Sequence, residues 1–69
     1  MMTFEKFMTI DPDLLHGTPV FRGTRVPIET LFDYLTTGES INNFLEDFPT
    51  VTADLVKQVL EYSKLALVA

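Results

Sequence analysis

Pro27 divides this sequence into two parts that differ in the spacing of their apolar residues. After it, apolar side chains recur every three or four residues, which is the spacing of an amphipathic helix. Before it, the pattern is closer to the alternation of β-structure and is broken by Pro and Gly. We therefore expect a mostly α-helical chain, in which a short N-terminal strand and a β-ribbon precede a three-helix bundle.

Three helices are predicted in the second part. The first begins with Pro27 as its first helical residue and ends before Gly38, which suits a C-terminal cap. The second follows Ser40 as its N-cap and stops at Pro49. The third is capped by Thr52 and runs from the next residue into the mid-sixties. The second helix, the turn and the third helix have the dimensions of a helix-turn-helix.

The first part predicts a strand followed by a small ribbon. Residues 3–10 are expected to be extended, with Phe7 on one face. The other face of this strand carries three apolar residues: Phe4, Met8 and Ile10. A tight hairpin turn at Arg22–Gly23–Thr24 is expected to join residues 20–21 to residues 25–26, because its glycine adopts a positive φ at no steric cost.

Length, cysteine content and charge limit the classes of protein to consider. The chain has 69 residues and no cysteine, so we expect one small domain without disulfides or thiolate ligands, in the cytoplasm. No apolar run approaches the ~20 residues that span a bilayer, and we expect no membrane contact. Ten acidic residues against five basic ones give a net charge of −5, which disfavours general binding to nucleic acid.

The residues that could support catalysis are isolated from one another. His16 has no second His or Cys nearby, and neither Ser40 nor Ser63 has the surroundings of a catalytic triad. The acidic residues are spread along the sequence rather than clustered as a two-metal nuclease requires. We therefore expect that the protein is not an enzyme and that it uses no cofactor and no metal.

A resemblance to a known family rests on the run from Asp11 to Pro27. Its Asp-Pro, Gly-x-Pro and Arg-Gly-Thr-Arg elements, with segments 38–41 and 45–49, resemble the bacterial domain-of-unknown-function family numbered 433. The resemblance covers residues 10–62, which leaves 1–9 as the N-terminal strand and 63–69 as a C-terminal helix extension. It implies a β-plus-helix-turn-helix fold and the role of a VapB-type antitoxin, which neutralises a PIN-like nuclease toxin and represses its own operon.

Six residues are candidates for contact with DNA in such a fold. They are Arg22, Thr24, Arg25, Thr50, Thr52 and Lys57. Arg22 is the better phosphate contact, because Arg25 is expected to pair internally with Asp11, Asp13 or Asp33.

The residues of the third helix are poorly suited to contact DNA bases. Thr52 is better explained as an N-cap than as a base contact. Asp54 would repel phosphate in the same turn, whereas family members commonly carry basic residues there. We therefore expect DNA binding by the free protein to be weak.

The apolar residues exceed what one small bundle can cover, so we expect a homodimer. Candidate partner contacts lie near the two ends of the sequence: Phe4, Phe7, Met8, Leu65, Leu67 and Val68. Three functions remain open. The first is an antitoxin that binds a PIN-like toxin, the second is a stand-alone helix-turn-helix DNA-binding regulator, and the third is a protein-interaction module that does not bind DNA.

Overall fold

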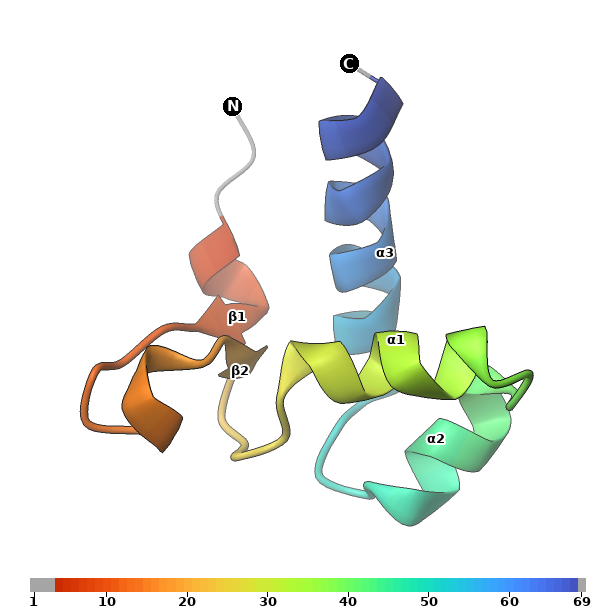
Figure 1. Cartoon of the computed structure of the whole chain (residues 1–69), viewed down its shortest axis with the longest axis horizontal. Coiled ribbons are helices and arrows are strands. Elements are labelled where there is room, and N and C mark those ends of the chain that lie inside the picture. The colour runs from red at the N-terminus through yellow and green to blue at the C-terminus, as the bar shows by residue number, and fades with distance from the viewer. Residues whose placement is uncertain (1–3, 69) are drawn as a thin grey trace.

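The structure, a computed structural model, describes residues 4–68, which form three α-helices and a two-stranded antiparallel sheet (Figure 1). In chain order, the elements are a 3₁₀ helix (Phe4–Lys6), β1 (Met8–Thr9), a second 3₁₀ helix (Leu15–Gly17), β2 (Val20–Phe21), α1 (Ile28–Thr36), α2 (Ile41–Asp47) and α3 (Ala53–Val68). The expected mostly helical fold with a small β element is confirmed.

Helix α1 ends in the motif that its sequence predicts. Gly38 has a φ of +88°, and its N–H donates to the carbonyl of Leu35 at 3.3 Å. The N–H of Glu39 donates to the carbonyl of Tyr34 at 2.9 Å, so the two bonds together form a Schellman motif. The expected start is displaced by one residue, because Pro27 is extended and serves as the N-cap.

The N-terminal caps of α2 and α3 are confirmed. The Ser40 hydroxyl accepts a hydrogen bond from the N–H of Asn43 at 3.0 Å. The Thr52 hydroxyl accepts from the N–H of Leu55 at 3.2 Å. Each side chain thus satisfies one of the free N–H groups with which every helix begins.

Of the expected strand over residues 3–10, residue 3 lies outside the described residues, and over residues 4–10 the prediction is wrong in its extent. Phe4–Lys6 is a turn of 3₁₀ helix, closed by a hydrogen bond from the N–H of Phe7 to the carbonyl of Phe4 at 3.1 Å. Only Met8–Thr9 is extended. The helical turn replaces the two-residue alternation expected there, and Phe7 is buried in the core.

The expected hairpin is present but short, and the sequence did not predict the pairing of β2 with β1. β2 pairs with β1, in the register Met8 with Phe21 and Thr9 with Val20, and on its other side the N–H of Phe21 donates to the carbonyl of Val26 at 3.0 Å. The predicted turn is present, since the N–H of Thr24 donates to the carbonyl of Phe21 and Gly23 has a φ of +77°. On that side a single bridge joins Val20 to Pro27, and it is flanked by hydrogen bonds from the N–H of Phe21 to the carbonyl of Val26 and from the N–H of Ile28 to the carbonyl of Pro19.

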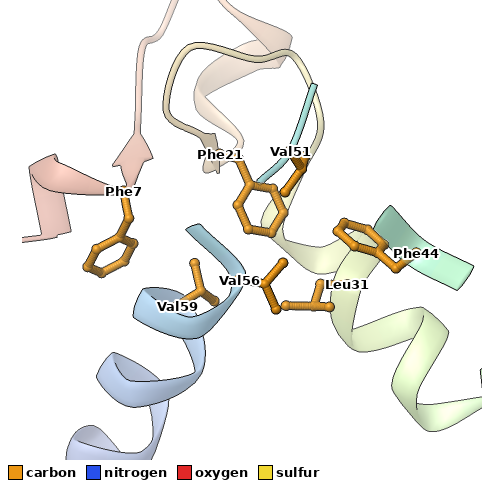
Figure 2. Packing of buried hydrophobic residues seen from close by; sticks show 7 residues of the cluster. All are labelled: Phe7, Phe21, Leu31, Phe44, Val51, Val56 and Val59. Atoms are coloured by element: carbon orange, nitrogen blue, oxygen red, sulfur yellow. The ribbon is translucent and has the colours of Figure 1, made fainter. Parts of the chain in front are cut away.

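One apolar core joins the β-sheet to the helices (Figure 2). Its buried members are Phe7, Phe21, Leu31, Phe44, Val51, Val56 and Val59. Phe21 of β2 lies between the helices, with its ring centroid 5.8 Å from that of Phe44 in α2. The ring of Phe7 packs against that of Tyr62 in α3, with a centroid distance of 5.5 Å. The side chains that pack around this core come from every helix and from both strands.

Loss of the Thr52 cap is expected to weaken α3 and, with it, the whole domain. Thr52→Ala should lower the free energy of unfolding by about 1 kcal/mol, because it leaves the N–H of Leu55 without its side-chain acceptor. Thr52→Ser keeps a hydroxyl at this position and should stay close to the wild type. Urea denaturation followed by circular dichroism measures both, and equal losses in the two variants would contradict the assignment of the cap.

Candidate functional site

The candidate DNA contacts lie on more than one part of the surface. Thr24, Arg25 and Thr50 line a single shallow depression of about 620 Å³, which forms where the turn after β2 meets the turn before α3. Arg22 lines a different depression, together with residues of the N-terminal 3₁₀ helix and β1. The fold therefore brings together three of the six candidates and separates Arg22 from them.

The two arginines exchange the roles that the sequence suggests. The guanidinium of Arg22 donates a hydrogen bond to the backbone carbonyl of Glu5 at 3.0 Å and so ties the turn to the N-terminal segment. Arg25 is exposed, and within residues 4–68 it pairs with none of the carboxylates of Asp11, Asp13 and Asp33. The expected internal ion pair is absent from this part of the chain. Both arginines are exposed, and Arg25 is the one that lies beside Thr50.

Two of the candidate threonines already use their hydroxyls within the fold. The Thr24 hydroxyl donates to the carbonyl of Phe21 at 2.8 Å and accepts from the N–H of Val26 at 3.0 Å. The Thr52 hydroxyl caps α3. Thr50 and Lys57 are both exposed, at the turn before α3 and on α3 itself. The exposed candidates whose side chains the fold does not use in these ways are Arg25, Thr50 and Lys57, and Arg22 is exposed but bound to the carbonyl of Glu5.

Charge is distributed unevenly over the molecule, and this pattern is visible in the sequence once it is sought. The segment between Arg25 and Lys57 contains no lysine or arginine. It carries six acidic residues, all exposed: Glu29, Asp33, Glu39, Glu46, Asp47 and Asp54. The charged residues of α1 and α2 are therefore all acidic, and the positive charges lie outside these helices, on the N-terminal part and on α3.

A hydrogen bond within this acidic surface joins α1 to α2. The phenol of Tyr34 donates to the carboxylate of Asp47. The same ring packs edge-on against Phe44 and Phe48, with centroid distances of 5.3 Å and 5.8 Å. The hydrogen bond to Asp47, then burial, and then the negative charges of Asp47 and Glu39 raise the pKa of Tyr34 above its ordinary value.

An apolar groove of about 380 Å³ lies among β1, α1 and α3. Its apolar lining includes Phe7, Met8, Ile28, Phe32, Val59 and Tyr62. Glu29 is the charged residue that borders it. Sequence reasoning missed this groove, because its residues come from three separated segments and no local pattern brings them together.

The candidate partner contacts divide into buried and exposed residues. The prediction that Phe7 contacts a partner is wrong, because its side chain is only 2% exposed and belongs to the core. Phe4 and Met8 are half-buried against that core. Leu65, Leu67 and Val68 in the last turn of α3 are 47%, 86% and 70% exposed, so they leave a substantial apolar surface in water.

The side chains buried in residues 4–68 are all apolar. Over the same range, no three His, Asp or Glu residues come together as metal ligands would. No helix among these residues has both the length and the apolar character needed to span a membrane. The candidate sites are therefore surfaces rather than enclosed chemical centres.

Comparison with known proteins gives the family of this chain. The family described as "Protein of unknown function (DUF433)" matches residues 8–63, which is most of the sequence. The chain belongs to this family. An "Uncharacterized protein y4eO" from Sinorhizobium fredii is 36% identical over 59 residues, which cover 86% of this chain and 27% of that protein. The chain thus spans about a quarter of this relative's length. No solved structure matches it significantly.

The Tyr34–Asp47 hydrogen bond is expected to make the free energy of unfolding depend on pH in the alkaline range. A raised pKa in the folded state means that the stabilisation is fully present below the ordinary tyrosine pKa of about 10 and is lost as the pH rises through the folded-state value. The free energy of unfolding should therefore fall more steeply above that pH in the wild type than in Tyr34→Phe. Asp47→Asn should lower the pKa of Tyr34, measured by the ultraviolet absorbance of tyrosinate. An unchanged titration in Asp47→Asn would refute this origin of the shift.

Proposed function

We propose that this chain acts as the antitoxin of a toxin–antitoxin pair in the cytoplasm and neutralises a PIN-like nuclease by binding it. The observation that carries the proposal is the surface of α1 and α2, which exposes carboxylates and no basic side chain. A nuclease binds RNA through a basic groove, and carboxylates presented to that groove substitute for phosphates. The resemblance described in the sequence analysis implies the same role.

These surfaces can bind a partner without the help of a catalytic residue. A long acidic surface attracts a basic partner, accelerates the encounter and disfavours acidic competitors. The neutralised nuclease would lose activity because its substrate groove is filled, and the chain needs no catalytic residue to achieve this. The proposed role is therefore that of an inhibitory ligand rather than an enzyme.

DNA binding is the second candidate function, and one observation favours it. α2, the turn after it and α3 follow one another as in a helix-turn-helix, with Thr50 and Lys57 exposed and Arg25 beside Thr50. We propose that these residues touch DNA in a homodimer bound to the nuclease. The acidic surface of α1 and α2 opposes DNA binding by the free chain.

The antitoxin proposal is tested with the product of the gene that adjoins that of this chain, which the proposal expects to be a PIN-like nuclease. Co-expression followed by affinity purification should recover both proteins, and the purified chain should inhibit the nuclease. Asp33→Lys combined with Glu46→Lys should weaken binding at least about tenfold, because like charges across an interface cost several kcal/mol. The side chains of both residues are exposed, so the fold should be retained.

A matched control makes the same change of net charge elsewhere. Glu5→Lys combined with Asp13→Lys alters two exposed carboxylates of the N-terminal part and should leave binding nearly unchanged. Equal losses in both double variants would show that net charge, and not the surface of α1 and α2, governs binding. The proposal is overturned if the wild-type chain neither binds nor inhibits the nuclease.

DNA binding by the free chain is expected to be weak and only moderately dependent on salt. With Arg25 and Lys57 as the available cations, a dimer would neutralise about four phosphates, which corresponds to a slope near −4 in log K against log salt. Addition of the basic nuclease should tighten binding to operator DNA by supplying further phosphate contacts. Fluorescence anisotropy over a salt series measures this, and a slope twice as steep for the free chain would place the DNA surface elsewhere.

A further inference from the structure

The last turn of α3 is apolar on every side. Consecutive residues of an α-helix are rotated by about 100°, so the four residues Leu65–Val68 cover a full turn. All four are exposed, and they lie on the part of α3 that rises away from α1 and α2 in Figure 1. A helix that is apolar all round is normally buried. This helix end therefore needs a partner that surrounds it.

The apolar groove lies directly beside this helix end. Val59, Tyr62 and Ser63 of α3 line the groove, and the unpartnered turn begins two residues later. The floor of the groove is apolar, and Glu29 borders it. The molecule thus carries a projecting apolar helix end and an apolar hollow next to it, and both are open to solvent.

We propose that the groove receives the end of α3 from a second copy of this chain, and that the two copies exchange their helix ends about a two-fold axis. Charge supports this occupant. Lys64 directly precedes the apolar turn and is exposed, and Glu29 is the charged residue at the groove. In the dimer, Lys64 pairs with Glu29 of the partner subunit, and the symmetry makes the contact twice.

A second copy covers both unpartnered surfaces at once. The chain itself supplies a matching occupant for each surface, since its helix end is an apolar projection and its groove is an apolar hollow. Reciprocal exchange buries each surface against the other, which is the self-complementarity that a two-fold interface requires. This inference does not depend on the proposed binding of a nuclease.

The first experiment measures the oligomeric state by light scattering and sedimentation over a concentration series. The wild-type chain is expected to be a dimer at micromolar concentration. Leu67→Glu should raise the dimer dissociation constant at least about tenfold, because a charge would enter an apolar groove. Leu67 is 86% exposed, so the variant should fold normally. Leu15→Glu changes another exposed leucine outside both surfaces and should leave the dimer intact.

The second experiment tests the charge pairing between the copies. Glu29→Lys alone and Lys64→Glu alone should each weaken the dimer, because each places like charges together. The double variant restores opposite charges and should recover most of the wild-type affinity. Both residues are exposed, so neither change should disturb the core.

The outcomes separate this inference from the proposed function. A strictly monomeric wild type, or a dimer that Leu67→Glu leaves unchanged, overturns it. Failure of the double variant to recover affinity overturns the pairing of Glu29 with Lys64. If the chain is monomeric and Leu67→Glu abolishes nuclease binding, the occupant is the nuclease and not a second copy, and the antitoxin proposal stands without this dimer.

Discussion

The packing of Phe21 against Phe44 is the contact on which the rest of the structure depends. Phe21 is fully buried, and it is the point at which the two-stranded sheet enters the core of the helices. A two-stranded sheet is marginal in water without such support. The contact also fixes the turn that follows β2, because the carbonyl and N–H of Phe21 hold Thr24 and Val26. The position of Arg25 beside Thr50 follows from this anchoring.

The helices could be predicted from the sequence because their signals are local. Ser40 and Thr52 cap helices through an N–H three residues away, and Gly38 ends α1 through bonds within one turn. These interactions depend on neighbours that the sequence places together. The sheet is different, because β1 pairs with a segment eleven to thirteen residues away and no local feature marks β2 as the partner of β1.

Of the candidate sites, too, only the features with a local signal could be predicted from the sequence. The exposed apolar turn of α3 is readable from its composition, since four consecutive apolar residues cannot all face one core. The roles of Arg22 and Arg25 were not readable, because the acceptor that Arg22 finds is the backbone carbonyl of Glu5 and not a side chain. A backbone carbonyl acceptor leaves no mark in the sequence, so the hydrogen bond of Arg22 could not be predicted from a nearby carboxylate.

The two surfaces proposed for binding are compatible with one another. The proposed dimer uses the groove, Glu29 and the end of α3, whereas Asp33 and Glu46 lie on α1 and α2 outside the groove lining. A dimer built in this way leaves those carboxylates exposed on both copies, so a basic partner would not compete with dimer formation. The same two-fold axis would relate two α2–α3 units, which is the arrangement that reads a palindromic DNA site. Because α3 carries both Lys57 and the exchanged helix end, the dimer contact would set the spacing of the two DNA-facing surfaces.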